Sequence, residues 1–144
     1  MRRWLFALIV ACLPAPAAAQ MVAHAVSVTT DGSGDATVYS TQTFGTVVAV
    51  RYVPHASTPI DGAGTLVVTD NSTGLQVLSV TLGSSSRDFW PRAFTVTTTG
   101  AVALYAGGGS NVLDLVPVAG AVKVVVASGG ATKSGTVYIY VQGR

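Results

Sequence analysis

The sequence predicts an all-β protein: a single antiparallel β-sandwich of jelly-roll or immunoglobulin-like type with about eight to ten strands. Glycine and polar clusters interrupt the chain about every 8–12 residues, a spacing typical of sandwiches and barrels. The intervening segments are rich in valine and threonine, which pack well on a pleated sheet. No helical period of apolar residues follows residue 19, so a helix is expected only in the N-terminal leader.

The first expected strands flank a glycine-rich turn. Residues 22–30 alternate, with His24, Val26 and Val28 on one face, and residues 36–41 give a second strand after the turn 31–35. Residues 46–53 are nearly all apolar, which predicts a central strand covered on both faces, and Pro54 ends it.

The remaining elements alternate between strands and turns. After a loop at 55–64, residues 65–69 and 75–82 predict a hairpin joined by the turn 70–74. A polar loop at 83–92 follows, and then come shorter strands at 93–98, 101–106 and 112–118. The segments 122–127 and 136–141 predict a C-terminal hairpin around the loop 128–134, with Tyr138 and Tyr140 on one face.

The N-terminus predicts a leader over residues 1–19. Arg2 and Arg3 precede the apolar run 4–13, and small residues end at Ala19, which is the layout of a secretory signal. The run is shorter than the roughly 20 apolar residues that span a bilayer. Cleavage after Ala19 would leave a β-sandwich domain at 20–144. The alternative is a retained N-terminal arm or helix that packs against a partner.

The net charge and the cysteine content limit the classes of function that the protein can have. Removing Arg2 and Arg3 from the eight cationic residues leaves six against six aspartates, so the domain at 20–144 is neutral. A neutral surface lacks the basic patch of a nucleic-acid or anionic-membrane protein, and it favours self-association. The single cysteine, Cys12, lies in the leader, so this domain has no disulfide to stabilise it.

The residues that usually carry catalysis are few and scattered. Nucleophilic catalysis needs a hydroxyl or thiol beside an oriented base, but His24 lies in a strand and His55 follows the strand-ending Pro54. Most aspartates lie in turns, and Asp114 lies on a short alternating strand, where solvent or a partner would face it. We therefore expect no enzyme and no cofactor.

One segment resembles part of a calcium loop. Asp31 and Asp35 place oxygen ligands at alternate positions around glycines, which makes them candidate metal ligands. An EF-hand loop also needs a bidentate glutamate and flanking helices, both of which this segment lacks. A turn with aspartate capping is the favoured interpretation, and no metal is expected.

The loop 87–92 is the best candidate for an interface. Trp and Arg are enriched at interface hot spots because they bury a large area and still donate hydrogen bonds. The alternative is that Phe89 and Trp90 plug one end of the core. The full set of candidate interface residues is Arg87, Phe89, Trp90, Arg92, Tyr138 and Tyr140.

Four stretches resemble a family of short all-β proteins encoded among the structural genes of tailed phages. They are DGSGDATVY at 31–39, VAVRYVP at 48–54, ALYAGGG at 103–109 and VKVVVASGGATKSGTVY at 122–138. The resemblance covers most of the chain after Asp31 and contains no chemical signature. It implies a virion component: a capsid decoration (cement) protein, or a neck or tail accessory subunit.

The expected function is therefore non-enzymatic packing within a phage particle. Its partners would be other virion structural proteins and further copies of this chain, with no nucleic acid and no membrane for the mature domain. The leader conflicts with assembly in the cytoplasm. The alternative is therefore an exported bacterial adhesin or surface-binding module, located in the periplasm or outside the cell.

Overall fold

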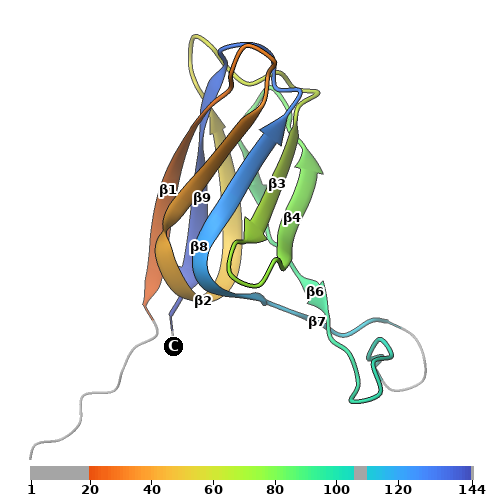
Figure 1. Cartoon of the computed structure of the whole chain (residues 1–144). Helices are drawn as coiled ribbons and strands as arrows, with labels where there is room; N and C mark the ends of the chain where they lie inside the picture. The colour runs from red at the N-terminus through yellow and green to blue at the C-terminus, as the bar shows by residue number, and fades with distance from the viewer. Residues whose placement is uncertain (1–19, 106–109, 144) are drawn as a thin grey trace, which may run out of the picture.

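The computed structural model describes residues 20–105 and 110–143, and these form an all-β fold of antiparallel strands without a helix (Figure 1). The expected leader at 1–19 lies outside the described residues. The strands are β1 (Met21–Thr29), β2 (Ala36–Pro54), β3 (Thr65–Asp70), β4 (Gln76–Thr81), β5 (Arg87–Phe89), β6 (Ala93–Phe94), β7 (Leu113–Asp114), β8 (Val116–Ala127) and β9 (Ser134–Gln142).

Seven strands form one sheet in the order β1-β9-β2-β8-β3-β4, with β5 attached to β2. Strand β2 is long enough to have two sets of neighbours. Its first part pairs with β8 up to Val47. Its second part, from Thr46 onward, pairs with β9 along one edge and, at residues 50–52, with β5 along the other edge. Register shifts occur after Tyr39 and after Val47, where bulges bend and twist a strand. The sheet consequently curls around its apolar face (Figure 1).

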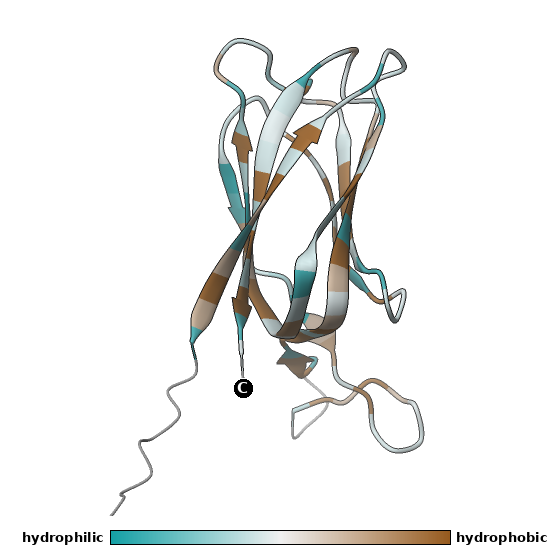
Figure 2. Cartoon of the chain, turned by 60° about the vertical axis from the view of Figure 1, so that its left-hand side comes forward, coloured by the Kyte–Doolittle hydropathy of each residue, from teal (hydrophilic) through white to brown (hydrophobic). Residues whose placement is uncertain are grey.

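The core consists mainly of valines that alternate with outward residues along the strands. Val122, Val124 and Val126 of β8 are fully buried, and so are Val137 and Ile139 of β9. Figure 2 shows the resulting alternation of hydrophobic and polar segments along the ribbons. Burying one such side chain contributes about 1.5–3 kcal/mol, so this continuous face stabilises a domain in which the described residues include no cysteine.

Several expected boundaries are wrong because glycine and proline do not break these strands. Residues 36–41 and 46–53 belong to the single strand β2, which is not covered on both faces, since Arg51 is exposed. Likewise, β8 runs through Pro117 and Gly120, where two strands with a gap were expected. The expected loop 83–92 contains β5, and the expected strand 101–106 is reduced to isolated bridges at Val102 and Leu104.

Candidate functional site

The most distinctive surface feature is an arm inserted between β5 and β8. We define the arm as residues 93–114, of which 93–105 and 110–114 are described. It includes β6 and β7, which form a separate two-stranded sheet, and it projects away from the main sheet (Figure 1). The arm therefore has few neighbours within the described chain.

Backbone hydrogen bonds give the arm a defined shape. The Thr95 N–H donates to the carbonyl of Val112 at 3.0 Å, and the Ala103 N–H donates to the carbonyl of Thr95 at 2.8 Å. The Val112 N–H donates to the carbonyl of Ala103 at 2.9 Å, so three short segments meet around Thr95, Ala103 and Val112. A tight turn follows, in which the Gly100 N–H donates to the carbonyl of Thr97 at 2.9 Å.

The arm turns its large apolar side chains outward. Phe94 lies opposite Leu113, and Val96 lies opposite Val102, so strand alternation places these pairs on one face. Leu104 shares that face because it lies two residues beyond Val102 on the same segment. We call Phe94, Val96, Val102, Leu104 and Leu113 the arm face; each is between 45% and 63% exposed. The smaller residues Thr95 and Ala103 are half-buried.

The loop 87–92, which leads into the arm, was expected to form either an interface or a plug at one end of the core. Its two aromatic residues differ in this respect. Phe89 is half-buried and packs against the core, whereas Trp90 is 65% exposed. The Arg87 guanidinium carbon lies 5.3 Å from the centre of the Phe89 ring, and Arg87 donates to the carbonyl of Thr81 at 3.2 Å. Arg92 donates to the carbonyl of Pro91 at 2.8 Å, at the base of the arm.

The remaining two candidate interface residues, Tyr138 and Tyr140, lie on the outward face of β9. Tyr138 and Tyr140 are half-buried and alternate with the buried Val137, Ile139 and Val141. Tyr140 lies between Ala23 and Ala49, and Tyr138 lies between Ala25 and Arg51. Since β5 pairs with the other edge of β2, the register brings Asp88 opposite Arg51, and an ion pair of 3.5 Å joins them. The candidate residues of β5 and β9 thus flank the same part of β2.

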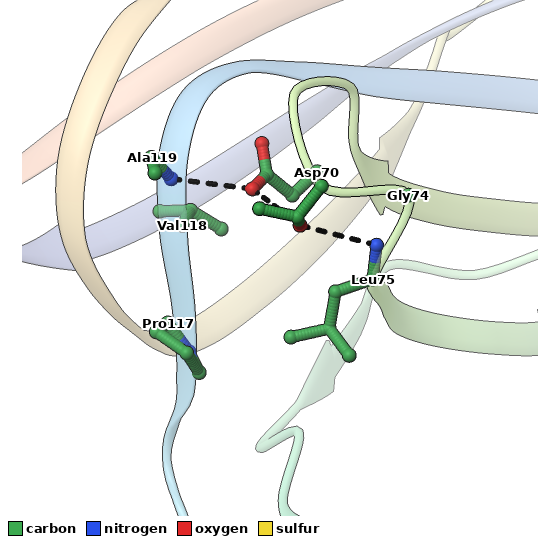
Figure 3. Close-up of a pocket in the computed structure, with 7 residues that line it drawn as sticks. Asp70, Gly74, Leu75, Pro117, Val118 and Ala119 are labelled. Carbon is green, nitrogen blue, oxygen red and sulfur yellow. Dashed lines mark hydrogen bonds between the residues drawn. The ribbon is translucent and has the colours of Figure 1, made fainter.

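A hollow of about 420 Å³ lies beside the start of β8, next to the base of the arm. It is lined by Asp70, Thr73, Gly74, Leu75, Pro117, Val118 and Ala119 (Figure 3). Leu75 is 40% exposed and Pro117 is exposed, so an apolar surface is open to solvent here. The described residues around this hollow carry one ionisable side chain, that of Asp70.

Asp70 is solvent-inaccessible, but its carboxylate is held by three donors. Oδ1 accepts from the Ser72 N–H at 3.2 Å, and Oδ2 accepts from the Thr73 hydroxyl at 2.7 Å and the Ala119 N–H at 3.3 Å. Desolvation raises the pKa of Asp70, but these hydrogen bonds together outweigh it and leave the pKa below its ordinary value. A carboxylate held ionised in this way ties the β3–β4 turn to β8 and is poorly suited to act as a general acid.

In the candidate calcium loop, residues 31–35, the Asp31 carboxylate is hydrogen-bonded to other groups of the same loop. Asp31 Oδ1 accepts from the Ser33 hydroxyl at 2.6 Å and from the N–H groups of Ser33 and Asp35 at 2.9 and 3.0 Å. The Ser33 hydroxyl is the main cause of the lowered pKa of Asp31. Asp35 instead accepts from the Ser128 N–H at 3.0 Å. Across the described ranges, no three His, Cys, Asp or Glu side chains lie close enough together to hold a metal ion.

Both histidines are engaged in local hydrogen bonds. His24 in β1 contacts two hydroxyls of β2: Nδ1 lies 3.0 Å from Thr41 Oγ1, and Nε2 lies 2.7 Å from Thr43 Oγ1. His55 Nδ1 lies 3.0 Å from the hydroxyl of Thr58. These contacts hold strands and a loop in place, and they form no nucleophile–base–acid arrangement.

Comparison with known proteins identifies no family. No family model matches the chain, and no curated protein is similar to it. One solved structure, described as the crystal structure of FLHE, matches 87% of this chain and the whole of that chain, at 13% identity and a TM-score of 0.42. A likeness this weak carries no functional argument. Among the described residues, no helix is long and apolar enough to cross a membrane.

The arm face was missed by the sequence reasoning. Its signal was present, because residues 94 and 96 alternate with the smaller Ala93 and Thr95. Alternation alone predicts that a strand has two unlike faces, and it cannot say which of them the rest of the chain covers.

Proposed function

We propose that this protein is a non-enzymatic structural subunit of a tailed-phage particle that acts by protein–protein packing. It would serve as a capsid decoration (cement) protein or as a neck or tail accessory subunit. The observation that supports this best is the arm, which presents five apolar side chains to solvent on one face. A monomeric soluble protein rarely exposes such a contiguous apolar patch unless a partner covers it.

The chemistry of the polar groups supports binding over catalysis. Asp70, His24 and His55 each hold neighbouring segments together through hydrogen bonds, as described above. The hollow beside Asp70 is mostly apolar in its lining, which suits contact with another apolar surface. We propose that the protein binds no cofactor and no nucleic acid.

We also infer that the sheet closes into a β-sandwich of jelly-roll or immunoglobulin-like type. This inference is supported by β2, which pairs with β8 in its first part and with β9 and β5 in its second. Strand β2 can therefore act as the corner between two packed halves, a role that bulged strands often have.

The link to a virion comes from the sequence resemblance, and particle sedimentation tests it. Phage particles purified by density-gradient centrifugation should contain this protein at a fixed ratio to the major capsid or tail protein. Washing at high salt should leave it bound, because an apolar contact between neutral surfaces is not screened. Absence of the protein from particles that are otherwise complete would exclude this function.

A second candidate function is an exported bacterial adhesin or surface-binding module in the periplasm or outside the cell. It is favoured by the position of β1, which begins at Met21, two residues beyond the expected cleavage after Ala19. Cleavage there would keep Gln20, whose carbonyl accepts from the Gly143 N–H at 3.1 Å. Mass spectrometry of the native protein separates the two candidates: a start at Gln20 supports export, and a start at Met1 or Arg2 supports the virion.

A further inference from the structure

The residue that export would leave at the N-terminus is a glutamine. Cleavage after Ala19 makes Gln20 the first residue of the exported chain. Gln20 is exposed, and strand β1 begins at the next residue, Met21. The side chain of a terminal glutamine has the length that lets its amide carbon meet its own α-amine in an unstrained five-membered ring. The two reacting groups are thus held within one residue, which favours their reaction.

The backbone contact that holds Gln20 to the sheet leaves both reacting groups outside it. The Gln20 carbonyl accepts from the Gly143 N–H at 3.1 Å, and Met21 then pairs with Gln142. Within the described residues, the backbone nitrogen of Gln20 donates no backbone hydrogen bond. Ring closure joins this nitrogen to the side chain and does not use the carbonyl. The contact with Gly143 and the pairing of β1 with β9 therefore remain possible in the cyclised protein.

The strands beside Gln20 offer no carboxylate that would hold its α-amine as an ammonium ion. Neither β1 nor β9 contains an aspartate or a glutamate, and neither does the described part of β2 that pairs with the end of β9, residues 46–49. An ordinary α-amine has a pKa of about 7.7–8.0, so a fraction of it is neutral near pH 7. A neutral amine is the nucleophilic form.

We propose that Gln20 of the exported protein is converted to pyroglutamate. The α-nitrogen attacks Cδ of the Gln20 side chain and forms a C–N bond. The bond from Cδ to Nε2 breaks, and Nε2 leaves as ammonia with the proton that the amine loses. The reaction is an amide exchange within one residue and needs no oxidant or second substrate. This inference rests on the second candidate function, export, because cleavage after Ala19 frees the α-nitrogen.

The modification would protect an edge strand. Strand β1 is the terminal strand in the order of the main sheet (Figure 1). Its first two side chains, Met21 and Val22, are 56% and 42% exposed, so this end of β1 is open to solvent. An aminopeptidase binds a free α-amine and removes residues one at a time. A lactam at residue 20 lacks that amine, so stepwise digestion could not begin at β1.

Mass spectrometry of the N-terminal peptide tests the modification. The full-length chain is produced in a bacterium that exports proteins, and it is purified from the periplasm or the medium. Samples are acidified on collection and digested with pepsin, because acid protonates the amine and prevents ring closure during preparation. The expected peptide begins at residue 20 and is lighter by one ammonia than the open form. Treatment with pyroglutamyl aminopeptidase should then remove residue 20 and leave Met21 at the N-terminus.

The matched control is Gln20→Asn. Asparagine keeps the amide and the backbone carbonyl, but its shorter side chain could close only a strained four-membered ring. The variant should therefore be exported and carry an open N-terminus. Incubation with a general aminopeptidase should shorten the Gln20→Asn protein and leave the wild type intact. Equal resistance of the two proteins would overturn the protective role of the ring and assign it to the pairing of β1 with β9.

The outcomes separate this inference from the export function. A peptide that begins at an open Gln20 would overturn the modification and keep export. A start at Met1 or Arg2 would overturn both, since the α-nitrogen of Gln20 would then remain in a peptide bond. A start beyond residue 20 would overturn the modification, because Gln20 would be absent from the mature chain.

Discussion

Gly45 of β2 lies directly against the backbone carbonyl of Gln142 in β9, so closely that a Cβ atom at residue 45 would overlap the carbonyl oxygen. Its φ of 145° is one that residues with a side chain rarely adopt. Gly45 pairs with Val118 of β8, and the next residue, Thr46, pairs with both Pro117 and Gln142. The close approach therefore occurs where β2 passes from one neighbour to the other.

Replacing Gly45 with alanine should destabilise the fold strongly. Backbone strain and the clash with Gln142 together predict a loss of about 2–4 kcal/mol in the free energy of unfolding, measured by urea denaturation. Gly32→Ala is the matched control, because nothing lies within 4 Å of a Cβ at residue 32 and its φ is ordinary. Equal stability of the two variants would show that β2 can pass between β8 and β9 without a glycine.

The same region explains what the sequence could and could not predict. The hairpin around Asp70–Gly74 was correct in outline, because local turn chemistry and alternation determine it. The expected C-terminal hairpin was wrong: both of its segments form strands, but β8 pairs with β2 and β3, and β9 pairs with β1 and β2, so β2 lies between them in the sheet. Strand β2 was wrongly divided because Gly45 resembles a turn residue locally. Its actual role depends on the carbonyl of Gln142, which is distant in sequence and which no local pattern contains.

The candidate site shows a similar limit. Trp90 was identified from its residue type, and it is exposed. Phe94 and Leu113 were read as members of ordinary short strands, although they lie opposite each other on an exposed face. These two residues are exposed because the arm projects away from the sheet. That projection is a property of the tertiary fold, and the local alternation of apolar and polar residues in the sequence does not reveal it.

Asp70→Asn should reduce stability at neutral pH. The asparagine side chain keeps one oxygen that can accept hydrogen bonds. Its NH₂ group replaces the other carboxylate oxygen and cannot accept a hydrogen bond from the N–H or O–H groups that face it. Charge-assisted hydrogen bonds contribute about 1.5–3 kcal/mol each, so a loss of about 2 kcal/mol is expected. Asp114→Asn is the control, since Asp114 is exposed and bonds only the adjacent Leu115 N–H among the described residues.

The pH dependence of this loss has a definite sign. Because the folded-state pKa of Asp70 is below its unfolded value of about 3.9, its ionised form contributes stability at neutral pH. That contribution disappears as the pH falls through the folded-state pKa. The difference between wild type and Asp70→Asn should therefore shrink between about pH 5 and pH 2, as followed by urea midpoints. A difference that stays constant over this range would contradict an ionised Asp70.

His24 and Thr43 should be energetically coupled. His24 Nε2 lies 2.7 Å from Thr43 Oγ1, and Thr43 is buried, so removing the imidazole leaves a buried hydroxyl without this partner. We expect His24→Ala to cost about 1–2 kcal/mol and Thr43→Val to cost less in the His24→Ala background than in wild type. A double-mutant cycle measured by urea unfolding gives the coupling energy. Additive effects would show that this contact does not tie β1 to β2.

The hydroxyl of Tyr52 is the one buried side-chain polar atom without a hydrogen-bond partner among the described residues. Tyr52 is fully buried, and its ring lies so close to Gly135 that a Cβ there would overlap it. Burial raises the pKa of Tyr52, and the nearby backbone of Ile60 offsets this only in part.

Tyr52→Phe should therefore preserve or increase stability, by up to about 1 kcal/mol, because it removes a buried polar group and keeps the ring. The raised pKa adds a test at high pH. The neutral phenol contributes its full stability below the unfolded pKa of about 10, and this is lost as the pH rises toward the folded-state value. Wild type should lose stability above about pH 10 more steeply than Tyr52→Phe in urea unfolding experiments. A Tyr52→Phe variant that is clearly less stable at neutral pH would instead show that the hydroxyl makes a favourable contact in solution.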